Sequence, residues 1–398
     1  MRRVLHVAPF LWSGAGNVIT RLCESQHRRW DVHIVTSGTS RGLRDWSGYR
    51  RRLTAAGIAH HRIDFFRRDS DVFWRGVEQL TRLVTHFVPD VVHTHAGVPA
   101  SAVAAVCENA SRSFRHVNHV YSWGVGRPSW MNTMDLAGIR RADAIVCSAT
   151  RYQRLLLDAG VPSAKLSYIP WGLELDRIDC APNTRTPPAA EPIIGFVGRL
   201  EPRKGQLELI RAFARLRRRM TSARLELVGP AADTSYVAHL KREIRSLGLE
   251  RSVVMTGHVA DPQRYISRWD LFVSLSSDEG QGLAVLEAMA NGVAVLARRV
   301  AGVEDYVQDG VTAWECLTDS PRAVADRMRD ALTSHRRGDV IAEARRMIER
   351  RYDWSRTVAQ IEELYGSSRD SRSQKTKIRP FRVLTTSDRP AHARLKGA

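Results

Sequence analysis

The strongest constraint on this chain is an alternation of short apolar runs with longer amphipathic stretches. In residues 1–180 the apolar runs predict strands at 4–9, 32–36, 91–95, 116–120 and 144–147. Amphipathic stretches at 17–26 and 73–87 predict helices between them. Strands that alternate with helices are typical of βαβ units and a parallel sheet. The first half is therefore predicted to be a doubly wound α/β domain.

The same alternation restarts after a proline-rich break, APNTRTPPAAEP, at 181–192. It predicts strands at 193–197, 224–228, 253–256, 271–275 and 294–297, and helices at 206–220, 235–247 and 283–291. Two such domains in series are expected to bind their ligand in the cleft between them, beyond the carboxyl ends of the strands. The Ser-, Arg- and Lys-rich tail, 367–398, is expected to be disordered or loosely attached, with docking on acidic membrane lipids as the alternative.

The charge balance points to an anionic partner. The net charge is +19, with the excess in 1–180 and in the tail, whereas 181–366 is nearly neutral. A basic surface attracts phosphates of nucleic acid, anionic lipid or a diphosphate-bearing substrate. Arginine far outnumbers lysine, so compositional bias is the alternative explanation. No nucleic-acid-binding module is recognisable, and no nucleic-acid partner is expected.

Cysteine usage and hydropathy indicate a cytoplasmic chain. The five cysteines are scattered, with no C-x-x-C pair, which suits a reducing compartment. No apolar run approaches the roughly 20 residues that span a bilayer. The N-terminus superficially resembles a signal peptide, but its apolar part is short, contains Pro9 and has no cleavage site. It is predicted to be a buried strand instead.

Two segments of the second half carry candidate chemistry. Strand 193–197 is followed by GRLEPRKG, in which Arg199 and Lys204 offer cations for phosphate oxygens beside Gly198. The alternative is an ordinary basic surface loop.

The other segment is SSDEGQGLAVLEAMANG, at 276–292. Gly280 and Gly282 form a turn, and the predicted helix from Leu283 points its positive end at that turn, which favours an anion. Glu279 and Glu287 are expected to accept hydrogen bonds from sugar and ribose hydroxyls.

Glu279 and Glu287 resemble the E-x7-E motif of retaining GT-B glycosyltransferases of the family 4 type. GFVGRLEPRKG, SAKLSYIPWGLELD, AGVEDYVQDGVTAW and YDWSRTVAQIEELY resemble further segments of that family, over nearly all of residues 1–366. The resemblance implies a GT-B fold of two Rossmann-like domains facing an interdomain cleft. It divides the chain into an acceptor-side domain (1–180), a linker (181–192), a donor domain (193–350), a helix returning to the first domain (351–366) and the tail (367–398).

The resemblance also implies roles for individual residues. Arg199 and Lys204 would neutralise the departing diphosphate, and Glu279 would hold the donor sugar with the backbone from Gly280 to Leu283. Glu287 would hold the ribose. Transfer would need no metal and no cofactor. The partners would be a nucleotide-diphospho-sugar and a hydroxyl acceptor, with a lipid-linked acceptor and an anionic inner membrane surface also considered.

Fewer signals in the first half are specific. Gly14 and Gly16 follow the first strand as a G-x-G, but position 19 is Ile, so the dinucleotide-binding fingerprint is weak. The resemblance makes these glycines a loop near the acceptor and the diphosphate. It makes His119 a residue that faces the reacting sugar, against the alternative of a packed histidine.

Two metal-like patterns are interpreted as structural. His93 and His95 lack a third ligand nearby in the sequence, so strand-end structure or acceptor contact is favoured over a metal site. Asp69-Ser70-Asp71 precedes an amphipathic stretch and is predicted to cap a helix. That helix is expected either to pack on the core or to lie on a membrane surface.

Two other functions stay open at this stage. One is another GT-B enzyme, such as a sugar-nucleotide epimerase or a phosphorylase. The other is a non-catalytic basic scaffold that binds membranes or polyanions, which predicts steeply salt-sensitive binding and no product.

Overall fold

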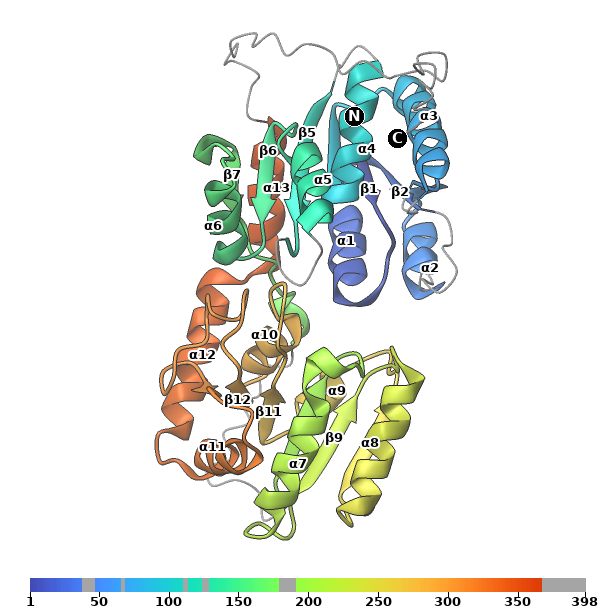
Figure 1. Ribbon diagram of the computed structural model, residues 1–398. Helices are drawn as coiled ribbons and strands as arrows, with labels where there is room; N and C mark the ends of the chain where they lie inside the picture. Colours follow the sequence, from blue (N-terminus) through green and yellow to red (C-terminus); the bar gives the residue numbers. More distant parts are fainter. Residues whose placement is uncertain (38–46, 66–68, 110–113, 124–128, 179–190, 367–398) are drawn as a thin grey trace, which may run out of the picture. The chain divides into compact units, whose positions relative to one another are not determined.

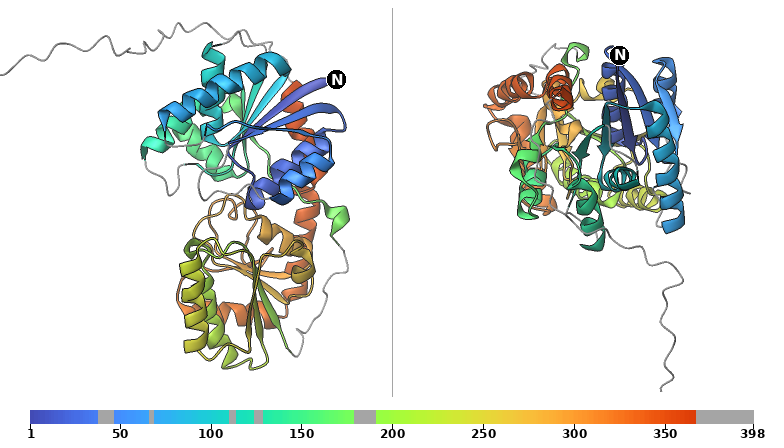
Figure 2. Two further views of the ribbon diagram at one scale, coloured as in Figure 1. Left: turned by 90° about the vertical axis from the view of Figure 1, so that its right-hand side faces the viewer. Right: turned by 90° about the horizontal axis from the view of Figure 1, so that it is seen from above.

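The computed structural model describes residues 1–37, 47–65, 69–109, 114–123, 129–178 and 191–366. These residues form two parallel sheets with helices on both faces of each (Figures 1 and 2). The predicted linker, apart from Glu191 and Pro192, lies outside the described residues, as does the predicted tail. Met1–Tyr365 forms one unit, so the division into two domains at 181–192 stays a prediction.

The first sheet has seven strands in the order β3-β2-β1-β4-β5-β6-β7. Their bounds are β1 Arg2–Ala8, β2 Trp30–Thr36, β3 Ala59–Arg62, β4 Val91–His95, β5 Arg115–Val120, β6 Ala144–Cys147 and β7 Leu166–Tyr168. Every residue of β4 is buried, because helices cover both faces of the sheet. The strand order reverses between β1 and β4, which is the switch point of a doubly wound sheet.

The helices of the first sheet pack largely through small and apolar residues. They are α1 Ser13–Gln26, α2 Ser47–Ala55, α3 Ser70–Phe87, α4 Gly97–Asn109, α5 Ser129–Ile139 and α6 Thr150–Asp158. Asp69 caps α3 as predicted, since its side chain accepts from the N–H groups of Asp71 and Val72. The apolar stripe of α3 packs on the core, although Trp74 on the same helix is 55% exposed.

The second sheet has six strands in the order β10-β9-β8-β11-β12-β13. The bounds are β8 Ile193–Val197, β9 Arg224–Val228, β10 Val253–Gly257, β11 Leu271–Ser274, β12 Ala294–Ala297 and β13 Trp314–Glu315. Its helices are α7 Gln206–Arg217, α8 Thr234–Ser246, α9 Gln263–Ile266, α10 Leu283–Ala290, α11 Pro321–Thr333 and α12 Arg337–Arg351. The switch point lies between β8 and β11, so their carboxyl ends are where a ligand is expected.

The last described helix, α13 (Trp354–Gly366), packs on the first sheet rather than the second. Its residues Trp354, Val358, Ile361 and Tyr365 share a core cluster with Val4 and Ala8 of β1. Tyr365 also donates to or accepts from His93 Nδ1 at 2.6 Å. The last described helix and the first strand therefore belong to the same hydrophobic core.

The predicted start of the first helix is wrong. The helix α1 begins at Ser13, not at Asn17, so Gly14 and Gly16 lie in its first turn and not in a preceding loop. A Cβ on Gly16 would lie 2.8 Å from the Leu11 carbonyl carbon and from the Tyr49 ring. Glycine at position 16 is therefore required by close packing between the loop after β1, α1 and α2.

Among the described residues, no helix is both long enough and apolar enough to cross a membrane. Cys23, Cys147 and Cys316 are free thiols, and Cys180 lies outside the described part.

Candidate functional site

The candidate site begins at the carboxyl end of β8. The strand runs into Gly198 and Arg199, and a short 3-10 helix, Pro202–Lys204, then delivers Lys204. Gly205 ends that helix with φ of +73°, and a Cβ there would lie 2.6 Å from the carbonyl oxygen of Leu275, at the end of β11. Only glycine permits this approach without strain, so the fold itself brings the lysine loop against the β11 loop.

The loop after β11 supplies the partner of Lys204. Lys204 Nζ donates to Glu279 Oε1 at 2.6 Å, and Ser276 Oγ donates to the same oxygen at 2.7 Å. Both side chains of the ion pair are largely buried, at 13% and 16% exposed. The two residues that the sequence assigned to diphosphate and sugar therefore lie in direct contact. The ammonium and carboxylate groups are therefore fixed in a partly desolvated site, where their electrostatic interactions with a charged or polar ligand are stronger than in water.

The glycine turn between Glu279 and α10 is tightly enclosed. Gly282 precedes α10 with φ of +73°, and Tyr306 Oη donates to the carbonyl oxygens of Gln281 and Gly282. A Cβ on Gly280 would lie 2.7 Å from the Tyr121 carbonyl oxygen. The turn thus leads directly into the positive end of α10 at Leu283, as the sequence predicts for an anion site.

Arg199 is close to this pair but is not part of it. Its Nη2 lies 3.1 Å from Glu201 Oε1, and its guanidinium carbon lies 5.8 Å from the centre of the Trp12 ring. Burial lowers the pKa of Arg199, and the carboxylate of Glu201 opposes that change. Because arginine starts far above neutrality, the side chain stays cationic. Glu201 is then a competitor that a bound phosphate must displace.

Glu287 lies one turn into α10 and has a different environment from Glu279. Burial raises its pKa to about 7, against the opposing charge of Arg21 on α1. Arg21 is also paired with Glu174, since its Nε lies 3.2 Å from Glu174 Oε2. Glu287 remains partly accessible to solvent. A carboxyl group that changes charge near neutral pH is suited to hydroxyl binding that depends on pH.

The predicted residues of the first sheet lie next to these elements. A Cβ on Gly14 would lie 3.4 Å from Leu283 Cδ1, so the start of α1 meets the start of α10. His119, within β5, is fully buried and stacks on Trp171, with ring centres 4.3 Å apart and planes at 5°. Burial lowers its pKa to about 3, and neither ring nitrogen has a hydrogen-bond partner. Its contact with a sugar stays a prediction.

Sequence reasoning missed Gln281, which joins the turn to the chain near Trp171. Its Oε1 accepts from the Trp171 N–H at 2.8 Å, and its Nε2 donates to the Trp171 carbonyl oxygen at 2.7 Å. The Thr150 N–H donates to Asp305 Oδ2, and Tyr152 Oη donates to the carbonyl oxygen of Glu279. A glutamine between two glycines gives no pattern that distinguishes it from a surface residue.

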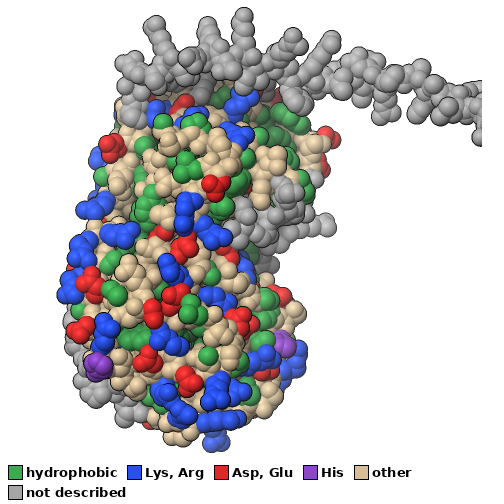
Figure 3. All heavy atoms as spheres, turned by 60° about the vertical axis from the view of Figure 1, so that its left-hand side comes forward, with side chains coloured by type: hydrophobic (Ala, Val, Ile, Leu, Met, Phe, Trp, Pro, Cys, Tyr) green, Lys and Arg blue, Asp and Glu red, His purple; other side chains and the backbone are tan. Residues whose placement is uncertain are grey.

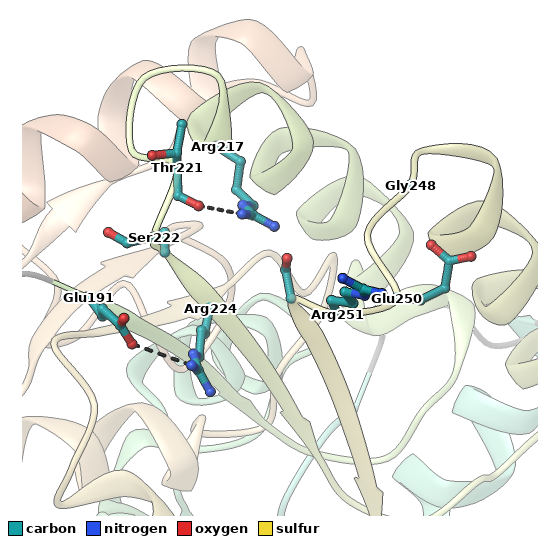
Figure 4. Close-up of a pocket in the computed structure, with 10 residues that line it drawn as sticks. Glu191, Arg217, Thr221, Ser222, Arg224, Gly248, Glu250 and Arg251 are labelled. Carbon is teal, nitrogen blue, oxygen red and sulfur yellow. Dashed lines mark hydrogen bonds and ion pairs between the residues drawn. The ribbon is translucent and has the colours of Figure 1, made fainter.

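Another hollow lies beside the second sheet and is a poor candidate site. It has a volume of about 580 Å³ and is lined by residues before β9 and β10 and at the end of α7. Figure 4 shows Arg224 paired with Glu191, and Arg217 bonded to the Thr221 backbone. These residues are at the amino ends of the strands, the edge opposite to that where ligands of doubly wound sheets bind.

Two family models match the chain consecutively. The model for Glycosyltransferase Family 4 matches residues 12–177, and the model for Glycosyl transferases group 1 matches residues 182–354. The chain belongs to the group 1/family 4 glycosyltransferases. The family 4 match covers most of the first sheet, and the group 1 match covers the second sheet with Lys204, Glu279 and Glu287.

Curated relatives are also glycosyltransferases. The chain is 31% identical over 245 residues to a GDP-mannose-dependent α-(1-6)-phosphatidylinositol monomannoside mannosyltransferase of Mycolicibacterium smegmatis, covering 57% of this chain and 63% of the relative. It is 26% identical over 306 residues to a Mycobacterium tuberculosis glycogen synthase, covering 72% and 70%. The chain therefore spans less than two thirds of the length of the mannosyltransferase.

Solved structures show the same fold. Anabaena HepE, in complex with UDP-glucose, superposes with a TM-score of 0.79 at 20% identity, over 92% of this chain and all of HepE. Sucrose-phosphate synthase from Thermosynechococcus elongatus gives 0.76 at 19% identity, over 92% of this chain and 98% of the synthase. The two parallel sheets are thus those of a GT-B fold, as the resemblance implied.

Proposed function

We propose that this family member is a retaining glycosyltransferase that moves a sugar from a nucleotide-diphospho-sugar to a hydroxyl acceptor. The observation that carries the proposal is the ion pair of Lys204 and Glu279, held beside the positive end of α10. A diphosphate needs cations and a helix end, whereas a sugar needs a carboxylate acceptor, and this place offers all three.

The residues divide into three tasks in this proposal. Arg199 and Lys204 neutralise the departing diphosphate with the backbone of Gly198 and of Gly280 to Leu283. Glu279 accepts hydrogen bonds from the donor sugar, and Glu287 accepts them from the ribose. When the diphosphate arrives, it replaces Glu279 as a partner of Lys204, which frees Glu279 Oε1 for the sugar.

The chemistry requires no carboxylate nucleophile. The leaving phosphate oxygens help to deprotonate the incoming hydroxyl on the same face of the sugar, through an oxocarbenium-like state. Stabilisation of the diphosphate charge by preplaced cations is then the largest catalytic contribution. In this proposal no metal ion takes part in the transfer.

The relatives suggest which donors to test first. One is named as GDP-mannose-dependent, and HepE is solved with UDP-glucose. We therefore propose a UDP- or GDP-linked hexose as the donor. His119, under Trp171, is proposed to define the wall of the sugar site, and the first turn of α1, with Gly14 and Gly16, to approach the diphosphate.

The acceptor is proposed to be lipid-linked, with the first sheet's helices toward an anionic membrane. Trp130 and Met134, four residues apart on α5, are 53% and 59% exposed, and Trp74 on α3 is 55% exposed. Exposed tryptophan side chains suit a membrane interface. The mannosyltransferase relative is named for a phosphatidylinositol-based acceptor. Free thiols among the described cysteines favour the cytoplasm as the compartment.

The face drawn in Figure 3 gives little support to the alternative of a polyanion-binding scaffold. On the face drawn in Figure 3, basic and acidic side chains are interspersed. On α12, Glu343 pairs with both Arg346 and Arg350. Interspersed charges of both signs do not produce the uniform field that polyanion binding requires.

The test combines a donor panel with an acceptor mixture. UDP-glucose, UDP-galactose, GDP-mannose and the free nucleotides UDP and GDP are first compared by thermal shift. The stabilising donor is then incubated with and without an extract of polar lipids, and products are analysed by mass spectrometry. Release of nucleoside diphosphate that depends on the extract supports a transferase. Stabilisation by none of the nucleotides, or donor turnover independent of any acceptor, contradicts the proposal. Flotation with anionic vesicles, with Trp130→Ser and Met134→Ser as variants, tests the membrane surface separately.

A further inference from the structure

Three buried histidines lie together on one face of the first sheet, and Tyr121, which bonds to His95, also lies against Gly280 of the donor turn. His6 comes from β1 and His93 and His95 from β4, and the strand register places His6 beside His93. All three are fully buried. One ring nitrogen from each lies within 4.8 Å of the corresponding nitrogens of the other two. This histidine cluster (His6, His93 and His95) brings a third imidazole to His93 and His95 from a strand that is distant from them in the sequence.

The other ring nitrogen of each histidine bonds to an oxygen atom. His6 Nε2 lies 2.8 Å from Gln26 Oε1, and His95 Nδ1 lies 2.7 Å from Tyr121 Oη. His93 Nδ1 lies 2.6 Å from Tyr365 Oη. Histidines that bind metals have this arrangement, because the second nitrogen donates to an oxygen that fixes the orientation of the ring.

The inward nitrogens are not fully satisfied by hydrogen bonds. Gln26 Oε1 can only accept, so the proton of His6 is on Nε2 and a lone pair is on Nδ1. His95 Nε2 lies 3.0 Å from that nitrogen, while His93 Nε2 is buried with no hydrogen-bond partner. A proton shared between His6 and His95 leaves His93 Nε2 unsatisfied, whereas a cation at the centre would satisfy all three nitrogens.

We propose that His6, His93 and His95 bind a divalent transition-metal ion of the zinc class inside the first sheet. The site is structural, distinct from the proposed transfer chemistry, and does not depend on it. Imidazole nitrogen is a preferred ligand of such ions, and it must be neutral to bind.

The geometry requires only side-chain movement. Zinc–nitrogen bonds of about 2.0–2.1 Å place two tetrahedral ligand atoms roughly 3.4 Å apart, close to the 3.0 Å that separates His6 Nδ1 from His95 Nε2. The ring planes lie 18–37° from parallel, so each ring must tilt toward the shared point.

The consequence of binding would be a cross-link between distant parts of the chain. The oxygen partners come from α1 (Gln26), from the end of β5 (Tyr121) and from α13 (Tyr365). A metal ion that fixes the three rings would fix these elements against β1 and β4. Removal of the ion is therefore expected to lower the unfolding temperature of the whole unit.

The test uses full-length protein from which any affinity tag has been removed, so that tag histidines do not contribute. The protein is unfolded with a chelator and refolded with and without Zn²⁺ or Co²⁺. The metal content after gel filtration is measured by mass spectrometry. We expect stoichiometric retention, a higher unfolding midpoint and, with Co²⁺, the visible absorption of a nitrogen-bound tetrahedral ion.

The variants separate this site from incidental binding. His93→Gln and His6→Gln should lose the bound metal and the Co²⁺ absorption. His33→Gln is the matched control, because His33 also pairs with a histidine (His61, 3.1 Å) but belongs to the opposite face of the sheet. If a cluster variant fails to fold, the wild type decides alone. The proposal is overturned if wild-type protein retains no metal and shows no Co²⁺ absorption. It is also overturned if His33→Gln loses as much bound metal as the cluster variants do.

Discussion

Replacement of Lys204 by Met tests the proposed diphosphate site most directly. The substitution removes a cation while keeping an unbranched side chain of similar length. In the wild type Lys204 Nζ bonds to Glu279 Oε1 at 2.6 Å, and both side chains are largely buried. Two outcomes are therefore linked: weaker binding of any nucleoside diphosphate, and a carboxylate left without its ion-pair partner.

The size of the binding effect follows from the electrostatics of this place. Unit charges about 4 Å apart interact by about 4 kcal/mol at an effective dielectric constant of about 20. Lys204 must give up part of its interaction with Glu279 to bind phosphate. The net contribution of Lys204 to diphosphate binding is therefore expected to be about half of that energy. About 2 kcal/mol corresponds to a roughly 30-fold increase in Kd, since about 1.4 kcal/mol is tenfold.

The stability effect should be smaller than that of a fully buried ion pair. Loss of one partner of a buried pair costs about 3–5 kcal/mol. Here Ser276 still donates to Glu279 Oε1 and some solvent reaches the carboxylate. We therefore expect the free energy of unfolding to fall by about 1–2 kcal/mol, measured with urea.

The assay is calorimetric titration with UDP and GDP, which share the diphosphate whatever the sugar is. Arg203→Met is the matched control, because Arg203 lies in the same loop but is 40% exposed and pairs with Glu201. Lys204→Met that binds both nucleotides within twofold of the wild type would refute the reasoning. So would an equal loss of affinity in Arg203→Met, because the effect would then be one of net charge alone.

Three further predictions concern the same unit. Burial raises the folded pKa of Glu287 to about 7, so its contribution to the free energy of unfolding is complete below the ordinary glutamate pKa and is lost as pH rises toward 7. Donor affinity should fall as pH drops through 7, because the protonated carboxyl group is a poorer acceptor for the ribose hydroxyls. In Glu287→Gln, donor affinity should not change with pH over this range. Gln281→Ala leaves the Trp171 N–H and carbonyl groups unpaired, so urea unfolding should show a loss of about 2–4 kcal/mol, whereas exposed Gln308→Ala should change little. Gly195→Ala would place a Cβ 1.9 Å from the Trp269 ring and should lower stability by about 3 kcal/mol, whereas Gly338→Ala, with nothing within 4 Å, should raise the thermal midpoint slightly; equal midpoints for these two variants would contradict the packing argument.

The central strands were the most predictable part of the fold. Ile193–Val197 and Ala294–Ala297 begin and end where their apolar runs do. Strands that are buried on both faces have continuous apolar sequences bounded by polar or glycine residues, so the signal is local. The parallel order of those strands and the GT-B fold followed from the alternation and from the family resemblance.

Helices α4 and α5 were not predicted, and their packing explains why. A Cβ on Gly138 of α5 would lie 2.4 Å from the Ser101 backbone of α4, and one on Gly97 would overlap Asp135. Helices that approach so closely use small residues at the contact. Small residues weaken the contrast between apolar and polar faces on which helix prediction depends.

The site was predictable as a set of residue types but not as a set of contacts. The pattern around Glu279 and Glu287 indicated a carboxylate, a glycine turn and a helix end, and these are adjacent in the structure. The sequence did not reveal that Lys204 would pair with Glu279, because the two residues come from loops 75 positions apart. His6 was missed for the same reason, since its place beside His93 depends on the crossover that puts β1 next to β4.

The packing of α13 on the first sheet has a consequence for how the protein is made. Tyr365 and its neighbours fill a core that also contains Val4 and Ala8. During synthesis the amino-terminal half therefore leaves the ribosome with part of its interior open to solvent, and it stays so until nearly the whole described chain has been translated. Chaperone dependence should therefore be greatest in nascent chains that end before Trp354.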